Sequence, residues 1–208
     1  MMRATKKRCL MLGWMLAYVE QVDTSEFSPS ESIRLLRSLT PLEQIERLPS
    51  YLRILREEGD RKLFAHFGRE WLATASAHDD EVAPPTEEYR FWMERMAYLR
   101  KQLGERGVVV DDSYCIKVGL TGWDMARLQL LSRVAYDRGL ISNRDMWNNQ
   151  IFAWKVVAST LDSWSDLGFS CLLGYVLQAD NVSWEKLYAC YQIATESVDS
   201  PWLATRFK

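Results

Sequence analysis

Apolar residues recur every three or four positions through most of the chain, most regularly between Thr121 and Gly174. This period places the apolar side chains on one face of a helix. Three hydroxyl residues in the stretch each stand three positions before an aspartate: Thr121, Ser142 and Ser163, before Asp124, Asp145 and Asp166. A hydroxyl at a helix N-cap accepts from the first turn, and the helix dipole favours an acid there. The stretch therefore predicts three successive helices.

The same signals predict helices elsewhere in the chain. Ser28 is followed by Pro29 and, three residues after the serine, by Glu31, which is typical of a capping box. Two further amphipathic runs follow Thr86 and Ser183. We expect a helix to begin at each of these hydroxyl residues.

Prolines and glycines predict where the helices in the N-terminal half end. Pro41 favours the start of a short helix and Pro49 its end, because a proline ring disfavours a helical residue before it. Gly59 is expected to divide two further helices, over 50–58 and 60–75. Apolar residues on the second of these recur every four positions and are expected to face the core: Leu63, Phe67 and Trp71.

One stretch departs from the helical pattern. Residues 108–120, VVVDDSYCIKVGL, begin with three β-branched residues, so we expect at most one short extended segment near 108–118. The sequence offers no second run to pair with it, and a lone strand leaves backbone groups unsatisfied. We therefore predict an all-α fold, a single irregular helical bundle of about nine short to medium helices. One domain is expected over 1–208, with helices within 10–103 packed on a block at 121–202.

The first 20 residues need a separate interpretation. A basic segment, MMRATKKRC, precedes the apolar run LMLGWMLAYV, an order that secretory signals share. The small residues of a cleavage site do not follow, and Leu10, Trp14, Ala17 and Tyr18 fit one face of a helix. We therefore expect a core helix. No apolar run reaches the roughly 20 residues that a membrane span needs.

Composition and charge narrow the class of protein. The chain has 26 Lys and Arg against 28 Asp and Glu, so no concentrated positive surface for nucleic acid is expected. The cysteines form no CxxC pair, which favours reduced core residues in a cytoplasmic protein. Nine tryptophans are typical of a large core and of protein contact sites.

No set of residues in the sequence indicates a reaction. The two histidines, His66 and His78, stand near no nucleophile motif such as GxSxG. The sequence also has no phosphate-binding loop and no HExxH metal motif. We expect no cofactor and no metal site, and an enzyme is the less favoured class.

Charged residues within an otherwise apolar helix form the first candidate site. Asp124 and Arg127 are three positions apart, Arg133 and Asp137 are four apart, and Tyr136 stands beside them. Such spacings place side chains on one helix face, and a buried arginine needs a partner. The residues form internal ion pairs, or they line a cleft where an arginine binds an anionic ligand or a partner's carboxylate.

A second candidate site is the loop at 77–86, AHDDEVAPPT, which ends with two prolines. Asp79, Asp80 and Glu81 give it negative charge, and it has no Lys or Arg. The loop is solvated and precedes a helix N-terminus, or it is an acidic protrusion that contacts a basic protein partner.

Several motifs in residues 121–202 together resemble a bacterial family named domain of unknown function 1266: GWDMARLQLLSRVAYDRGLIS, DMW, SWSDLGFSCLLG and SPW. Upstream, EEGDRKLF at 57–64 resembles a family segment that usually has His at the position of Asp60. The resemblance implies an α-helical bacterial protein with an accessory role, and it supplies no catalytic residues.

These observations favour a cytoplasmic, non-enzymatic protein-binding module. The most specific form of this hypothesis is an immunity or adaptor protein that binds and blocks a cognate toxin or effector. The alternative is an enzyme or small-anion sensor that uses a cleft around Arg127 and Arg133. A third hypothesis is a homodimer built on exposed tryptophans.

Overall fold

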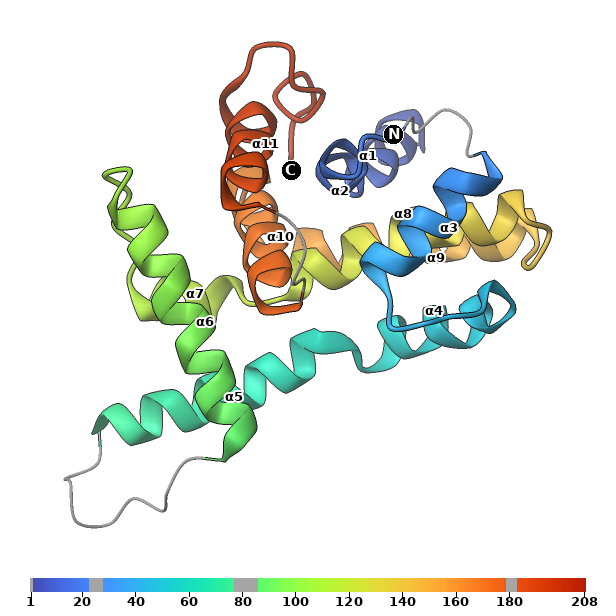
Figure 1. The fold of residues 1–208 in the computed structure, drawn as a ribbon. Coiled ribbons are helices and arrows are strands. Elements are labelled where there is room, and N and C mark those ends of the chain that lie inside the picture. Colours follow the sequence, from blue (N-terminus) through green and yellow to red (C-terminus); the bar gives the residue numbers. More distant parts are fainter. Residues whose placement is uncertain (1, 23–27, 77–85, 179–182) are drawn as a thin grey trace.

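The computed structural model describes residues 2–22, 28–76, 86–178 and 183–208 (Figure 1). These ranges contain helices and no strand, which confirms the predicted all-α fold. In chain order the elements are α1 (Met2–Met11), α2 (Trp14–Val19), α3 (Pro29–Leu39), the 3-10 helix η1 (Ile45–Arg47), α4 (Leu48–Glu57), α5 (Gly59–Ser76), α6 (Glu87–Gly104), α7 (Asp112–Val118), α8 (Thr121–Asp137), α9 (Asn143–Thr160), α10 (Trp164–Gln178) and α11 (Trp184–Glu196). None of the described helices combines the length and apolar character that crossing a membrane requires.

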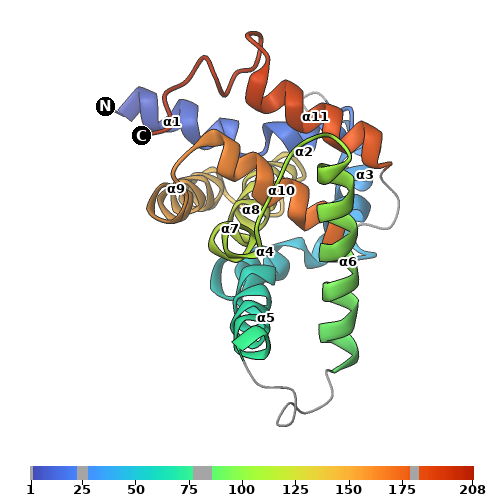
Figure 2. The same cartoon turned by 90° about the vertical axis from the view of Figure 1, so that its left-hand side faces the viewer.

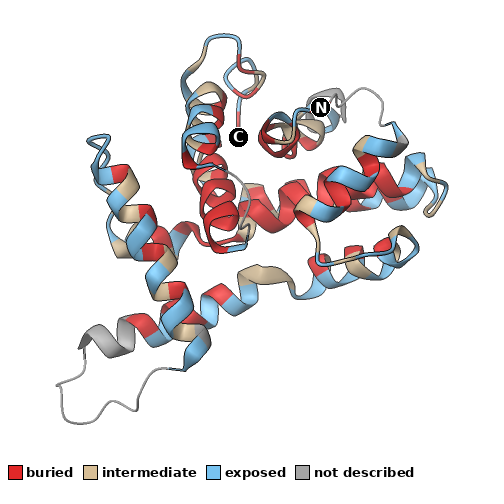
Figure 3. Cartoon of the chain, viewed as in Figure 1, coloured by how far each residue is buried: buried red, intermediate tan, exposed pale blue. Residues whose placement is uncertain are grey.

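Helix α8 lies at the centre of the molecule. It packs most extensively against α9, α10 and α4, and Figure 3 shows the buried positions concentrated along α8 and α10. A helix that is buried on every side is usually apolar throughout. Helix α8 nevertheless contains four buried polar residues: Asp124, Arg127, Gln129 and Ser132.

Two of these polar residues connect α8 to its neighbours. The Oε1 atom of Gln129 accepts a hydrogen bond from the backbone N–H of Gly13, just before α2, at 3.1 Å. The Nε2 atom of Gln150 in α9 donates to the Gln129 carbonyl oxygen at 2.9 Å and to Ser132 Oγ at 3.0 Å. Buried polar groups in α8 thus fix the positions of the helices around it.

Helices α5 and α6 extend from one end of the molecule (Figure 2) and cross each other in the view of Figure 1. They meet through an aromatic cluster of Phe64, Phe67, Trp71, Tyr89 and Trp92, whose neighbouring ring centroids lie between 5.1 and 5.7 Å apart. Such contacts bury large rings without requiring polar partners. The α5–α6 pair is therefore held together mainly by aromatic packing.

The capping signals in the sequence gave five correct helix starts and one wrong one. At Thr121 the prediction is wrong, because Leu120 is the N-cap of α8 and its side chain makes no capping hydrogen bond. The other hydroxyl groups accept from a first-turn backbone N–H as predicted: Ser28, Thr86, Ser142, Ser163 and Ser183.

Most of the segment near 108–118 that was expected to be extended is helical, because helix α7 occupies Asp112–Val118. Asp111 is its N-cap, and the carboxylate accepts the backbone N–H of Tyr114 at 2.6 Å. Cys115 and Val118 are buried. The cap and this burial outweigh the β preference of the valines that precede them.

The predicted roles of Pro41 and Pro49 are also wrong. Pro41 begins no helix, since the next element, η1, begins at Ile45. Pro49 lies in the first turn of α4 and does not end a helix. First-turn backbone positions have no acceptor inside the helix, so the missing N–H of proline costs nothing there. On α5 the core side is formed by Phe64, Phe67 and Trp71, whereas Leu63 is 54% exposed.

The apolar N-terminal run enters the core as a broken helix. Leu12, Met15 and Leu16 are fully buried, whereas Tyr18, expected on the inner face, is 44% exposed. The helix is interrupted at residues 12–13, between α1 and α2, so one uninterrupted helical period does not describe the whole run. This region is also where the two ends of the chain meet, since Trp202 Nε1 donates to the Met11 carbonyl oxygen at 2.6 Å.

Candidate functional site

Asp124, in the first turn of α8, holds the start of α5. Its carboxylate accepts the backbone N–H of Asp60 at 3.2 Å and that of Arg61 at 2.9 Å. These first-turn amides have no acceptor within α5, and a carboxylate there also interacts favourably with the helix dipole. Asp124 is fully buried. The residue therefore acts as an N-cap supplied by another helix.

Gly59 makes this arrangement possible. The chain turns from α4 into α5 at this residue with φ +61°, a conformation that L side chains rarely adopt. A Cβ atom here would also collide with the carboxylate of Asp124 and lie 2.6 Å from Arg61 Nη1. Glycine is thus required both by the backbone angle and by the space.

Arg127 lies one turn after Asp124 and is only 4% exposed. Its Nη2 atom donates to Asp124 Oδ1 and to Asp60 Oδ2, each at 2.6 Å. Nη1 donates to Tyr51 Oη at 3.1 Å and to the Leu39 carbonyl oxygen at 3.3 Å. Nε has no hydrogen-bond partner among the described residues. The guanidinium therefore takes partners from α3, α4, α5 and α8.

Arg61 completes this group of side chains. Nη1 donates to Asp124 Oδ2 at 3.2 Å and to the Leu55 carbonyl oxygen at 2.5 Å, and Nη2 donates to the Arg56 carbonyl oxygen at 2.6 Å. The two carbonyl groups belong to the last turn of α4, where no backbone N–H of the helix can reach them. We call Asp60, Arg61, Asp124 and Arg127 the arginine–aspartate centre.

The charges of the centre balance, with two arginines facing two aspartates. Burial acts to lower the pKa of Arg127, but the nearby Asp124, Tyr51 and Asp60 outweigh it and raise this pKa above its usual value. Burial raises the pKa of Asp124, while the charge of Arg127 opposes the rise. Burial also raises the pKa of Tyr51, so its hydroxyl stays protonated at neutral pH. Removing one partner of such a buried pair typically costs about 3–5 kcal/mol.

A pocket of about 300 Å³ lies over the edge of the centre, in the bend between α4 and α5. We call it the elbow pocket. Asp60 is the member of the centre that reaches it, and 22% of the Asp60 side chain is exposed. The lining residues are Tyr51, Ile54, Leu55, Glu58, Gly59, Asp60, Lys62 and Leu63.

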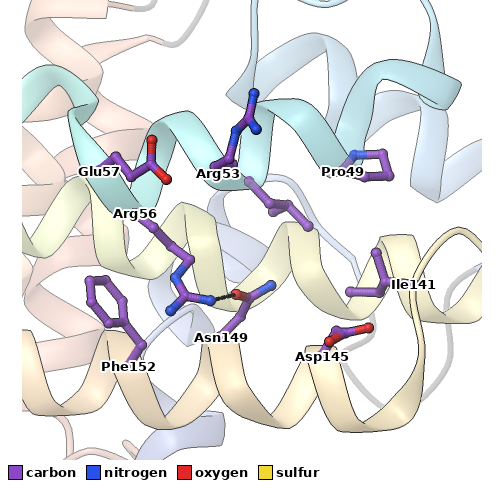
Figure 4. Close-up of a pocket in the computed structure, with 9 residues that line it drawn as sticks. Pro49, Arg53, Arg56, Glu57, Ile141, Asp145, Asn149 and Phe152 are labelled. Atoms are coloured by element: carbon purple, nitrogen blue, oxygen red, sulfur yellow. Dashed lines mark hydrogen bonds between the residues drawn. The ribbon is translucent and has the colours of Figure 1, made fainter.

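A larger groove of about 480 Å³ lies on another side of α4, between this helix and α9 (Figure 4). We call it the α4–α9 groove. Arg56 crosses it, since its Nη1 donates to Asn149 Oδ1 at 3.1 Å and its guanidinium lies 4.7 Å from the ring centre of Phe152. The lining residues are Pro49, Leu52, Arg53, Arg56, Glu57, Ile141, Asp145, Asn149 and Phe152.

The structure brings together only part of the predicted cleft. Asp124 and Arg127 form a buried ion pair. Arg133 is half-buried, and Tyr136 and Asp137 are exposed near the end of α8. The helical rise places Arg133 about 9 Å beyond Arg127 along the axis, so these residues do not converge on one site. An anion at Arg127 would have to displace Asp60 or Asp124.

The other predicted candidates lie elsewhere. Asp79, Asp80 and Glu81 fall outside the described residues, as does His78. His66 is exposed on α5 and lies 3.1 Å from Glu70. Within the described ranges no group of three or more His, Cys, Asp or Glu side chains is arranged to hold a metal ion.

Sequence reasoning missed Asp60, Arg61 and Tyr51. Periodicity offers no signal for them, because all three stand outside the helix that contains Asp124 and Arg127. The motif EEGDRKLF at 57–64, which contains Asp60 and Arg61, was the feature of the sequence that pointed to this part of the site. Two segments that resemble the same family, around Asp60 and around Asp124, meet in the arginine–aspartate centre.

The fold and this centre define a class, an all-α protein in which a buried, charge-balanced cluster joins α4 and α5 to a central helix. The chain belongs to the family described as Protein of unknown function (DUF1266), whose model matches residues 43–207. All four members of the arginine–aspartate centre lie within this match. No curated protein and no solved structure matches the chain at a significant level.

Proposed function

We propose that the protein is a non-enzymatic protein-binding module and that its partner binds in the α4–α9 groove. The main support is a preformed groove of about 480 Å³ that combines two arginines with apolar side chains. This volume is typical of ligand-binding clefts. Leu52, Ile141 and Phe152 offer apolar contacts, and Arg53 and Arg56 offer positive charge.

The arginines favour a partner segment that carries a carboxylate. Arg53 and Arg56 are three positions apart on α4 and therefore lie on the same side of the helix. Arg56 is already held by Asn149 and Phe152, so it loses little freedom when it binds. Arg53 is exposed and forms no ion pair with another described residue. Figure 4 shows the Arg53 side chain pointing away from Arg56, so each guanidinium group offers a separate contact, and a guanidinium group can bind a carboxylate through two hydrogen bonds.

We further propose that the partner is a toxin or effector and that this protein blocks it in the cytoplasm, as an immunity or adaptor protein. A protein that inhibits by occlusion needs a rigid contact surface and no catalytic residues. Helix α4 meets the first requirement, because the arginine–aspartate centre fixes its C-terminal end. All four cysteines are buried and unpaired, which suits a reducing compartment.

The test begins with affinity capture of the partner and its purification. Isothermal titration calorimetry then compares the wild-type protein with Arg53→Glu and Arg56→Ala. We expect each variant to weaken binding at least about tenfold. Arg53→Glu places a negative charge near the partner's carboxylate, and Arg56→Ala removes a guanidinium group that would bind it. Arg90→Glu, an exposed residue on α6, is the matched control and should bind like the wild type. Equal affinity of all four proteins would remove the groove from the proposal.

The toxin hypothesis has its own readout. Expression of the purified partner's gene should stop the growth of a host, and co-expression of the wild-type protein should restore it. Arg53→Glu should restore growth less well than Arg90→Glu at equal protein levels. A partner that is harmless alone would contradict the immunity role and leave an adaptor that binds through the same groove.

A further inference from the structure

The elbow pocket has polar groups at one end and apolar walls. The ion pairs of the arginine–aspartate centre behind it form without any further group in the pocket. Ile54 and Leu63 are 48% and 54% exposed, and both line this pocket together with the buried Leu55. Exposed aliphatic side chains that face one another across a concave bend form an apolar recess. Tyr51 and Asp60 supply the polar groups in the same recess.

The carboxylate of Asp60 uses only one of its oxygens for internal contacts. Oδ2 accepts from Arg127 Nη2 at 2.6 Å and from Trp123 Nε1 at 3.3 Å. Oδ1 has no hydrogen-bond partner among the described residues, and a carboxylate oxygen can accept two hydrogen bonds. Tyr51 Oη accepts from Arg127, and its own proton has no acceptor in the described part of the chain. Both groups therefore have unused hydrogen-bonding capacity.

The carboxylate oxygens in the pocket lining that have no partner among the described residues favour a ligand that donates hydrogen bonds and carries positive charge. Glu58 and Asp60 contribute two carboxylates to the lining and Lys62 one ammonium group, and Arg127 behind the lining balances the charge of Asp60. Arg127 is absent from the lining but pairs with Asp60 through Oδ2 as well as with Asp124, so Asp60 Oδ1 is the atom left for a ligand. Arg61 is also absent from the lining and donates to Asp124 and to two backbone carbonyl groups. An anion would meet two carboxylates here, and a purely apolar ligand would leave Asp60 Oδ1 desolvated and unpaired.

We propose that the elbow pocket is a binding site for a small organic amine. The ammonium group donates to Asp60 Oδ1, and the aliphatic part packs against Ile54, Leu55 and Leu63. A volume of about 300 Å³ suits an amine of a few carbon atoms.

This site is separate from the α4–α9 groove. The pocket uses Tyr51, Ile54, Leu55 and Glu58, which follow helical spacings of three and four, whereas the groove uses the stripe that contains Leu52, Arg53 and Arg56. The two sites thus lie on different sides of α4. Binding of an amine can be tested independently of any protein partner.

Trp123 provides the readout, because its indole N–H donates to the carboxylate that is proposed to hold the amine. The experiment records ¹H–¹⁵N spectra of the full chain during titration with n-butylammonium chloride, with the Trp123 indole signal assigned through Trp123→Phe. We expect a saturable shift of this signal. The indole signals of Trp164 and Trp202, which donate to the carbonyl groups of Thr205 and Met11, should stay in place.

Two chemical controls test the charge requirement. Sodium butyrate and n-butanol at the same concentration and ionic strength carry the same aliphatic chain without the cation. Neither should shift the Trp123 indole signal saturably. An equal response to n-butanol would overturn the amine site and leave an apolar recess, and so would the absence of a saturable shift with n-butylammonium.

Leu63→Arg tests the location without changing the centre, and Asp60→Asn removes the proposed acceptor itself. Leu63→Arg places a cation at the wall of the pocket and should weaken n-butylammonium binding at least about tenfold. Ile33→Arg, at a residue of α3 that is 45% exposed, is the matched control and should bind like the wild type. Asp60→Asn, compared at a temperature where circular dichroism shows it folded, should abolish the shift. Unchanged binding by Leu63→Arg would overturn the proposal.

Discussion

Arg127 takes its hydrogen-bond partners from α3, α4, α5 and α8, and this explains how a charged residue is tolerated inside a buried helix. A buried arginine without partners would be very unfavourable. The spacing of Asp124 and Arg127 predicted their pairing, because residues three apart share a helix face. Asp60 could not be predicted in this way, since it stands 64 positions before Asp124 in a different helix.

At the residue scale, Gly59→Ala tests whether the bend between α4 and α5 depends on glycine. We expect the free energy of unfolding to fall by more than about 2 kcal/mol, because the new Cβ atom meets Asp124 in a backbone conformation that is already unfavourable. Urea denaturation followed by circular dichroism measures the loss. Gly139→Ala is the control, since it has φ +70° but open space, and it should cost about 1 kcal/mol. Equal losses would show that the contact with Asp124 is unimportant.

At the scale of elements, local capping chemistry decides most helix starts. The hydroxyl groups of Ser142 and Ser183 accept from the first turn as the sequence predicts. Helix α8 differs, because Leu120 is its N-cap and Ser170 Oγ in α10 instead accepts the backbone N–H groups of Gly122 and Trp123, at 2.9 and 3.2 Å. A distant helix thus replaces the local cap that Thr121 was expected to provide.

Two alanine substitutions distinguish these kinds of helix start. Ser142→Ala should lower the free energy of unfolding by about 1 kcal/mol, because the backbone N–H of Asp145 loses its acceptor. Thr121→Ala should change it by less than about 0.5 kcal/mol, since its side chain caps nothing. Thermal and urea denaturation of both variants give the comparison. A larger loss for Thr121→Ala would favour the cap that the sequence predicted.

At the scale of the whole molecule, the two ends of the chain meet on α9 and α10. Trp202 is fully buried, donates to the Met11 carbonyl oxygen, and stacks on Trp164 with ring centres 5.5 Å apart. Arg8 Nε donates to the Arg206 carbonyl oxygen at 2.8 Å. The C-terminal segment therefore joins α1 to the rest of the core.

Trp202→Ala tests this closure. We expect the free energy of unfolding to fall by about 3–5 kcal/mol, because the change leaves a cavity and removes the indole N–H that donates to the Met11 carbonyl oxygen. Hydrogen exchange should show the largest loss of protection in α1 and α2. Leu203→Ala, at a neighbouring residue that is 49% exposed, should cost less than about 0.5 kcal/mol. A small and uniform loss for Trp202→Ala would contradict the role of the C-terminal segment.

The sequence by itself determined the helical class and most helix starts, because amphipathic periods and hydroxyl caps act over one or two turns. It also singled out Asp124 and Arg127, which share one turn of α8. The error at 108–118 arose because three valines favoured an extended chain, whereas the cap at Asp111 and the burial of Cys115 decided for a helix.

Only the tertiary structure decided which polar groups meet. Asp60 and Arg61 reach Asp124 because Gly59 turns α5 across the start of α8, and the same turn forms the elbow pocket. The α4–α9 groove likewise joins Arg56 to Asn149, 93 positions away. Such contacts depend on how helices pack, and the period of one helix contains no information about the position of another.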